Sequence, residues 1–239
     1  MYQVSGRDVT VFENRAEAGR GLAEALVKQG KPYGAVLGLT RGGVPVSYEV
    51  ASALGVPMDI LVVKKLRAPL SEELAIGAVA ADGTHVLHKE VVNEVGADEK
   101  YIAKELQLRR DEAREAEQRY RGGHAALDIK GLAVLIVDDG IATGASLEAA
   151  VLSARQRGAQ TITVATPVGS RGGCEALKRV ADEVFCMTRP VDFWAVGMFY
   201  RDFTQVSDDE VIKLLDKSRS APAKVEQKRQ PSEAPPQTV

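Results

Sequence analysis

The sequence predicts an α/β fold, with a mostly parallel twisted sheet flanked by helices, and three observations indicate it. Short apolar runs with strand character alternate with amphipathic helical segments along most of the chain. The chain has 239 residues and is 45% hydrophobic, which is enough for one sizeable core. Helical segments end at glycines such as Gly30 and Gly158, where a new strand can begin. Such alternating units form right-handed βαβ connections on a mostly parallel sheet.

Each core element has its own signal. The first helix covers 13–29, because apolar residues recur there at helical spacing and Gly30 and Pro32 end it. GAVLGL at 34–39 is a short apolar run and is expected to be a buried strand. The other core elements expected are a helix at 44–54, a strand at 59–65, a strand at 132–138, a helix at 145–157, a strand at 161–168, a helix at 174–181 and a strand at 183–187.

The middle of the chain is expected to form a loop-hairpin-helix insert at 66–123. A loop surrounds Pro69, a hairpin turns at Asp82-Gly83, and a long charged helix with a solvated face covers 98–120. A single domain is expected over 1–217. The segment 218–239 has almost no large apolar residues and is expected to be a disordered tail.

Charge and cysteine content exclude several classes of protein. A net charge of −2 gives no basic footprint for nucleic acid or an anionic membrane. No apolar run approaches the ~20 residues that span a bilayer, and no secretion signal is visible near the first residue. Cys174 and Cys186 are too few for a disulfide framework and lack metal-ligand spacing, so we expect buried, reduced thiols in a cytoplasmic protein.

The stretch VLIVDDGIATGAS at 134–146 contains the residues best suited to bind a ligand. Asp138 and Asp139 end a strand, and parallel sheets bind ligands outside the carboxyl ends of their strands. The turn that follows offers backbone amides and a helix N-terminus to an anion, with hydroxyls from Thr143 and Ser146. A phosphate in the turn, with sugar hydroxyls or a hydrated Mg²⁺ on the carboxylates, is the layout of a ribose 5-phosphate.

Two further segments suit a diphosphate. GLTRGGVP at 38–45 follows a predicted strand, and its glycine pair lets backbone amides approach an anion, while Arg41 can bind phosphate oxygens in a bidentate way. Lys64 and Lys65 end the strand DILVV, where cations are well placed for the same anion.

VLIVDDGIATGAS resembles the signature that type I phosphoribosyltransferases use to bind 5-phosphoribosyl-1-pyrophosphate (PRPP). The resemblance implies that Asp138 and Asp139 are the catalytic acidic pair, hold the ribose hydroxyls, and contact Mg²⁺ mainly through water and PRPP. The implied 5′-phosphate loop is Gly140, Ile141, Ala142, Thr143, Gly144, Ala145 and Ser146. The implied pyrophosphate site is Thr40, Arg41, Gly42, Gly43, Lys64 and Lys65, with a strained, often cis, peptide at Thr40-Arg41.

The resemblance leaves the acceptor base open. FWAVGMFYRDF at 193–203 is similar to the hood of purine-salvage members, which implies that Trp194 stacks on the base, with Val196 and Asp202 nearby. Against this, Ala142 stands where members for 6-oxopurines carry an aspartate. The resemblance also implies that the insert is a mobile lid, that 188–217 forms the hood, and that the chain is a homodimer.

Three functions follow from these residues. The first is an Mg²⁺-dependent phosphoribosyltransferase that joins PRPP to a nitrogenous base. The second is a non-catalytic regulator that binds PRPP or a nucleotide, and the third is a ribose-phosphate hydrolase or lyase. A regulator of DNA or RNA would need a basic face or a helix-turn-helix domain, and neither is evident, so we favour the enzyme.

Overall fold

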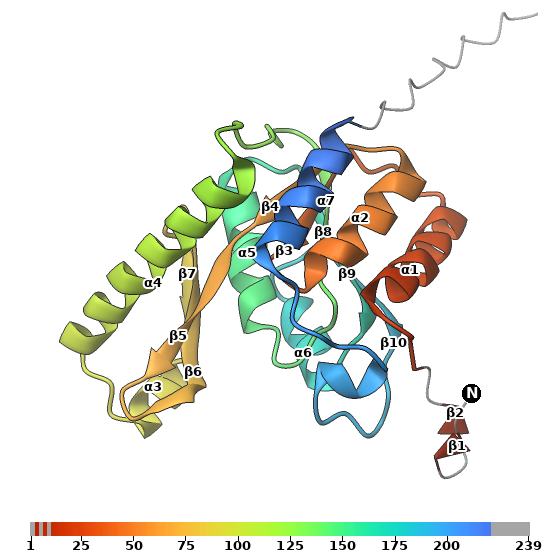
Figure 1. Cartoon of the computed structure of the whole chain (residues 1–239). Coiled ribbons are helices and arrows are strands. Elements are labelled where there is room, and N and C mark those ends of the chain that lie inside the picture. The colour runs from red at the N-terminus through yellow and green to blue at the C-terminus, as the bar shows by residue number, and fades with distance from the viewer. Residues whose placement is uncertain (1–2, 5–6, 9–10, 221–239) are drawn as a thin grey trace, which may run out of the picture.

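A computed structural model describes residues 3–4, 7–8 and 11–220, and the side chains of 11–71 and 74–220 (Figure 1). Its centre is a five-stranded sheet in the order β10-β9-β8-β3-β4, in which all neighbouring strands are parallel. The strands are β3 (Ala35–Leu39), β4 (Met58–Leu61), β8 (Ala133–Val137), β9 (Thr161–Val168) and β10 (Glu183–Thr188). The predicted α/β fold is therefore confirmed.

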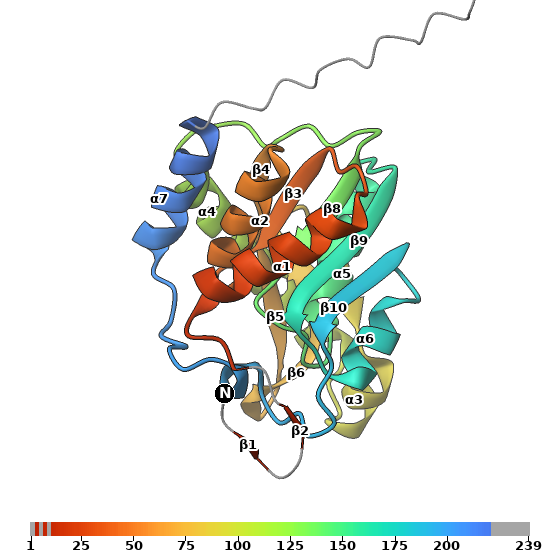
Figure 2. The ribbon, with the colours of Figure 1, turned by 90° about the vertical axis from the view of Figure 1, so that its right-hand side faces the viewer.

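Helices cover both faces of this sheet (Figure 2). One face carries α1 (Arg15–Gln29), α2 (Gly43–Leu54) and α7 (Asp208–Ser220), and the other carries α5 (Ala145–Gln156) and α6 (Arg171–Leu177). Leu135 and Val137 of β8 pack in the first core, whereas Val134 and Ile136 pack in the second. Alternate residues of a strand face opposite sides, so burial on both faces requires the continuous apolar run that the sequence shows.

Local signals set several helix ends. Asn14 caps α1, because its side chain accepts a hydrogen bond from the amide of Glu17 at 3.0 Å. The same helix ends at Gly30 in the left-handed region, with φ 66°. These are the boundaries that the sequence predicted within two residues.

An arm projects from one edge of the core (Figure 1). It consists of three antiparallel strands, β5 (Val63–Ala68), β6 (Ser71–Ala80) and β7 (His85–Leu87), followed by α3 (Lys89–Glu94) and α4 (Glu99–Arg121). The turn predicted at Asp82-Gly83 lies between β6 and β7, and Gly83 has φ 96°. The short helix α3 was not predicted.

The strand predicted at 59–65 is wrong, because the chain passes from one sheet to another within it. Residues 59–65 form the end of β4 and the start of β5, which belong to different sheets and are separated at Val62. Val62 is buried, and its carbonyl accepts the amide of Ala81 at 3.2 Å. The apolar run is continuous through this point, so hydrophobicity alone cannot reveal where the chain leaves the core sheet.

Two further boundaries need correction. The predicted helix 174–181 is α6, which begins earlier because Ser170 caps it by accepting the amide of Gly173. No helix was predicted at α7, which continues to Ser220 and so overlaps the start of the predicted tail at 218. The rest of that tail, 221–239, lies outside the described residues, as do parts of the N-terminus around β1 (Gln3–Val4) and β2 (Arg7–Asp8).

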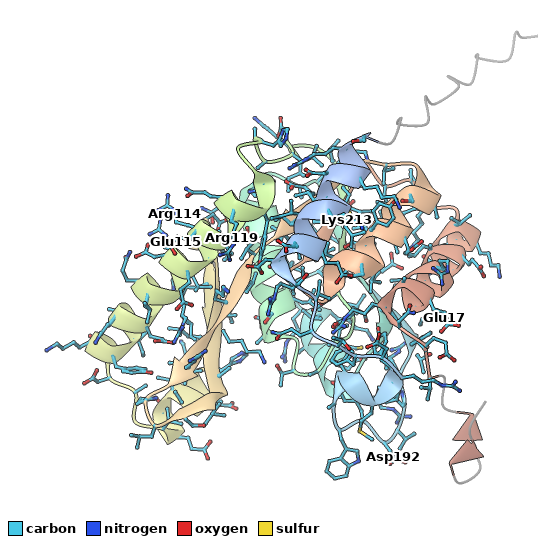
Figure 3. The ribbon with its side chains drawn as sticks, in the orientation of Figure 1. Glu17, Arg114, Glu115, Arg119, Asp192 and Lys213 are labelled. Carbon is cyan, nitrogen blue, oxygen red and sulfur yellow. The ribbon has the colours of Figure 1, made fainter. Side chains whose placement is uncertain are left out.

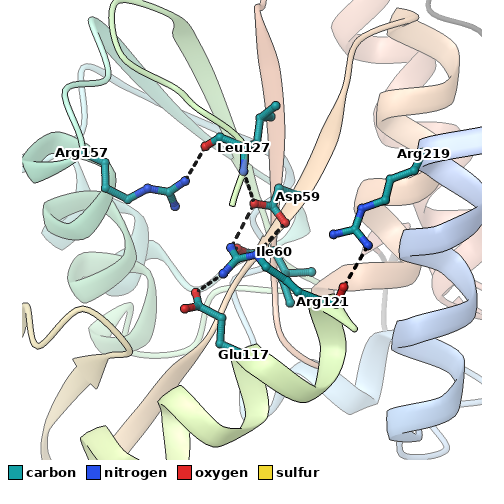
Figure 4. Close-up of polar contacts among 7 residues, drawn as sticks. All are labelled: Asp59, Ile60, Glu117, Arg121, Leu127, Arg157 and Arg219. Atoms are coloured by element: carbon teal, nitrogen blue, oxygen red, sulfur yellow. Dashed lines mark hydrogen bonds and ion pairs between the residues drawn. The ribbon is translucent and has the colours of Figure 1, made fainter. Parts of the chain in front are cut away.

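A buried ion pair joins the arm to the core (Figure 4). Arg121, the last residue of α4, donates to both carboxylate oxygens of Asp59 on β4, at 3.3 and 2.9 Å, and both side chains are under 10% exposed. Glu117 contacts Arg121 at 2.8 Å, and the amide of Leu127 donates to Asp59. The end of the charged helix is therefore buried against the sheet, whereas most of 98–120, where a solvated face was predicted, is exposed or half-buried.

Candidate active site

A hollow opens at the carboxyl end of β8, where the chain turns into α5. It has a volume of about 180 Å³ and is lined by 140–146 together with Lys65, Asp138 and Val196. The fold thus brings together residues from the predicted phosphate loop, acidic pair, basic pair and hood. The amides in the first turn of α5 have no partner within the helix, so they are available to an anion in this hollow.

Of the acidic pair, Asp138 lines the hollow, and Asp139 is the next residue in the chain. Burial and the neighbouring carboxylate of Asp139 raise the pKa of Asp138 well above its usual value. Burial also raises the pKa of Asp139, although its hydrogen bond with Arg15 opposes the rise. Two adjacent buried carboxylates resist ionising together. A ligand that donates hydroxyl hydrogens to them, or brings a cation, would relieve that repulsion.

Arg15, at the start of α1, is the direct partner of Asp139. Its Nε donates to Asp139 Oδ2 at 2.8 Å, and its Nη1 donates to the carbonyl of Thr204 at 2.8 Å. The guanidinium carbon lies 3.9 Å from the centroid of the Phe203 ring. The Tyr200 hydroxyl donates to the backbone carbonyl of Asp139 at 2.6 Å. One carboxylate of the pair is therefore fixed by residues from α1 and the hood.

The glycine pair lies directly against the two aspartates. A Cβ on Gly43 would stand 2.8 Å from the Cα of Asp138, and a Cβ on Gly42 would overlap the carboxylate of Asp139. Real Cβ atoms essentially never approach other atoms this closely. Both positions therefore require glycine if the two loops are to meet.

Arg41, on the same loop as the glycine pair, contacts Asp208 at the start of α7. The peptide bond Thr40-Arg41 is cis, as the resemblance implied. Arg41 Nη1 lies 3.4 Å from Asp208 Oδ1, and that carboxylate also accepts the Tyr120 hydroxyl at 2.7 Å and contacts Arg119 at 2.9 Å. The hydrogen bond from Tyr120 is the largest cause of a lowered pKa of Asp208. Figure 3 shows Arg119 near the end of α4, beside α7.

The two predicted lysines are separated by strand geometry. They are consecutive residues of β5, and consecutive side chains of a strand point to opposite faces. Lys65 lines the hollow and lowers the pKa of Asp138, whereas Lys64 is not among the lining residues. The structure therefore brings Lys65 to the acidic pair and leaves Lys64 outside.

The three predicted base-binding residues lie in different surroundings. Val196 lines the hollow. Trp194 is 84% exposed, in the same loop as Asp192, which marks the outer end of the hood in Figure 3. The Asp202 carboxylate is exposed and accepts the amide of Thr204 at 3.0 Å. Only Val196 of the three lies at the hollow, and the roles of all three stay predictions.

A second hollow, of about 270 Å³, lies between the arm and the core. Its charged lining is mixed in sign, with Arg114 and Arg157 beside Glu117 and Asp82. Arg121, which also lines it, already binds two carboxylates. This hollow therefore gives no anion or cation a clear preference, and it contains neither aspartate of the acidic pair.

The residues that sequence reasoning missed are those that support the site from a distance. Arg15 and Asp139 are 124 positions apart, and Arg41 and Asp208 are 167 apart. Arg15 and Asp208, the two that were missed, are ordinary charged residues at the start of a helix, so no local pattern marks them.

Known proteins resemble this chain in sequence and in fold. The sequence model of the family described as "Phosphoribosyl transferase domain" matches residues 9–203. Two proteins from two strains of Mycobacterium tuberculosis, each named "Putative phosphoribosyl transferase", are 42% identical over 208 residues, which is 87% of this chain and 47% of theirs. The chain therefore spans about half the length of these curated relatives.

A solved structure is similar over nearly the whole of its own length. The crystal structure of a protein from Thermus thermophilus has a TM-score of 0.74 and 42% sequence identity, and the match covers 87% of this chain and 99% of that one. Along the part of the chain that the structure describes, no helix combines the length and apolarity needed to cross a membrane.

Proposed function

The chain belongs to the phosphoribosyl transferase domain family, and we propose that it is an enzyme that transfers the 5-phosphoribosyl group of PRPP to a nitrogenous base and releases pyrophosphate. The observation that carries this proposal is the meeting of four segments at one hollow: the phosphate loop, the acidic pair, Lys65 and the hood. The glycine pair adjoins the same two aspartates. PRPP has one chemical group for each of these features except the hood.

The phosphate loop and the acidic pair would bind the ribose half. The amides of 142–146 and the hydroxyls of Thr143 and Ser146 suit the 5′-phosphate, whereas the amide of Ile141 already donates to the carbonyl of Val168. The ribose hydroxyls would donate to Asp138 and Asp139, which relieves the repulsion between two carboxylates that burial has brought together. In this account Arg15 keeps Asp139 ionised and oriented for that contact.

The loop 40–43, which adjoins the acidic pair, and Lys65, which lines the hollow, would hold the leaving pyrophosphate. In the transfer, a nitrogen of the base forms a bond to C1′ of the ribose, while the bond between C1′ and the pyrophosphate oxygen breaks. The ribose passes through an oxocarbenium-like state. Backbone amides at Gly42 and Gly43, with Arg41 and Lys65, would stabilise the charge that grows on the leaving oxygen.

Magnesium is part of the proposal in a limited role. The described residues contain no group of three or more His, Cys, Asp or Glu side chains placed to hold a metal. Mg²⁺ commonly binds through one or two carboxylates, several waters and substrate phosphates. Asp138 and Asp139 fit that pattern, and the ion would neutralise charge on the pyrophosphate.

The acceptor is proposed only as a purine or pyrimidine. Val196 lines the hollow and could contact a flat ring, while Trp194 is exposed nearby in the hood and could stack on one only if the hood closes. Ala142, in the phosphate loop, cannot take part in proton transfer. A homodimer and a cytoplasmic location also stay proposals.

A panel assay tests the function. The protein is mixed with PRPP, Mg²⁺ and, one at a time, adenine, guanine, hypoxanthine, xanthine, uracil and orotate, and pyrophosphate release is measured. Release that depends on one base supports the transferase and names its acceptor. Release without any base would instead indicate the hydrolase, and tight PRPP binding without release would indicate the regulator.

A site variant and a matched control variant test whether the release measured in that assay comes from the proposed site. Asp139→Asn removes a charge from the proposed ribose contact and should abolish base-dependent release. Asp182→Asn alters an exposed aspartate whose carboxylate is paired with Arg155 away from the hollow, and should leave release unchanged. Equal activity in both variants would contradict the assigned site.

A further inference from the structure

The two cysteines of the chain lie next to each other behind the phosphate loop. Cys174 is on α6 and Cys186 is on β10, and they are 1% and 8% exposed. A Cβ placed on Gly169 would stand 2.8 Å from the sulfur of Cys174 and 2.9 Å from that of Cys186. The two sulfur atoms therefore lie beside one place on two different elements, close enough for each thiol to perturb the pKa of the other.

The thiols differ in how readily they ionise. The neighbouring Cys186 thiol lowers the pKa of Cys174 to about 7, against the effect of burial, and Arg189 adds to the lowering. The pKa of Cys186 is raised by Cys174 and by burial, and its thiol donates to the carbonyl of Thr188 at 3.1 Å. One sulfur can therefore act as a nucleophile near neutral pH, while the other keeps its proton beside it.

The same place is joined directly to the phosphate loop. Gly169 pairs with Ile141 in a β-bridge. Ser170, the next residue, donates from its hydroxyl to the carbonyl of Ala142 at 2.5 Å. Gly173 approaches that carbonyl so closely that a Cβ there would overlap it. Any movement of α6 relative to β10 is therefore passed to the loop that lines the hollow.

We propose that Cys174 and Cys186 are an oxidisable dithiol, and that their disulfide distorts the phosphate loop and weakens its hold on a phosphate ester. The oxidant is a peroxide. The disulfide itself is independent of the proposed function, whereas the effect on PRPP rests on it. A covalent S–S bond of about 2.05 Å draws α6 and β10 together across Gly169, which the loop uses as its β-bridge partner.

The chemistry balances with one peroxide for each pair. The Cys174 thiolate attacks a peroxide oxygen, so an S–O bond forms, the O–O bond breaks, and the released hydroxide takes a proton and leaves as water. The Cys186 sulfur then attacks the same sulfur while its proton passes to the departing hydroxyl, so the S–S bond forms and the S–O bond breaks. The hydroxyl leaves with the Cys186 proton as a second water, and two electrons have passed from sulfur to oxygen.

Mass spectrometry tests the disulfide directly. The chain has two cysteines, so an intramolecular disulfide can join only Cys174 and Cys186. The protein is treated with hydrogen peroxide, denatured, and exposed to an alkylating agent before its intact mass is measured. We expect the loss of two hydrogens and no alkylation, reversed by a reductant. Addition of oxygen atoms, or alkylation of both thiols after peroxide treatment, would overturn the proposal.

Hydrogen–deuterium exchange tests the link to the loop without any substrate. In the oxidised protein the amides of 141–146 should exchange faster than in the reduced protein, and PRPP affinity should fall about tenfold. Cys174→Ser and Cys186→Ser each remove the disulfide, and peroxide should then change neither reading. A disulfide that leaves loop exchange unaltered would refute the coupling. Reduced protein that binds no PRPP would instead refute the proposed function alone.

Discussion

The two loops that meet at the acidic pair are supported in opposite ways. The phosphate loop, 140–146, is one contiguous segment whose shape comes from backbone contacts and from its junction with α5. The loop around Gly42 and Gly43 depends on side chains from distant elements, with Arg41 held by Asp208 and Gly42 packed against Asp139. The first loop is held mainly through backbone groups of the single segment 168–173, whereas the second is held by charged side chains from several distant elements.

This difference has a functional meaning. A ribose phosphate needs a fixed cradle, which a contiguous motif can supply wherever a strand leads into a helix. A leaving pyrophosphate gains negative charge as its bond to C1′ breaks. Hydrogen-bond donors from several elements are placed to stabilise that charge. We therefore expect variants near the second loop to act through partners far away in sequence.

The largest effect is expected from Gly43→Ala. Its new Cβ would stand 2.7 Å from the carbonyl oxygen of Val137 and 2.8 Å from the Cα of Asp138, so the two loops must separate. We expect PRPP to bind roughly 100-fold more weakly by titration calorimetry. Gly172→Ala is the matched control, because a Cβ there meets nothing within 4 Å. Wild-type affinity in Gly43→Ala would show that the loops need not touch.

Arg15→Gln should have the next largest effect. It removes the cation that pairs with Asp139 and stacks on Phe203. The site then loses a positive charge beside a polyanionic ligand, and Asp139 loses the group that orients it and favours its ionised form. PRPP affinity should fall about tenfold. Arg20→Gln, on the same helix, breaks only a surface pair with Glu49 and should change nothing. Tighter binding in Arg15→Gln would mean that Arg15 competes with the ribose.

A smaller effect is expected from Asp208→Asn. It removes the charge on α7 that pairs with Arg41. Because both side chains are one-third exposed, the pair is screened by solvent and its loss should weaken PRPP binding only modestly. The KM for PRPP should rise about threefold with kcat unchanged. Asp209→Asn, one residue along the same helix, is the control. An equal change in both variants would indicate a general effect of charge on α7.

The smallest effect separates the two lysines. Lys65→Gln should weaken PRPP binding about twofold at low salt, because Lys65 lines the hollow and is exposed to screening. Lys64→Gln should have no effect, because Lys64 does not line the hollow. Affinities measured at two salt concentrations would decide this, and the reverse order would place the wrong lysine at the site.

The sequence predicted what depends on neighbours in the chain. The core strands and most helices follow from apolar periodicity and from end signals such as Gly30 and Gly158. The phosphate loop follows from a contiguous motif. The break at Val62 could not be predicted, because both sides of it are apolar and buried.

The sequence could not predict pairs made by the tertiary fold. Arg15 and Asp208 have no local mark, since their role depends on Asp139 and Arg41, which approach them only after folding. The pairing of Cys174 with Cys186 is similar, because spacing in the sequence gives no sign that α6 and β10 place the two sulfurs together. In each case the function lies in a contact between two elements.

Titration of the reduced wild-type protein with PRPP in the presence of Mg²⁺ tests the central claim most directly. Ribose 5-phosphate and pyrophosphate, titrated in parallel, report on the two loops separately. The account predicts saturable PRPP binding that is tighter than that of either fragment and is lost in Asp139→Asn. A folded protein that binds no PRPP, or binds it no better than pyrophosphate alone, would contradict it.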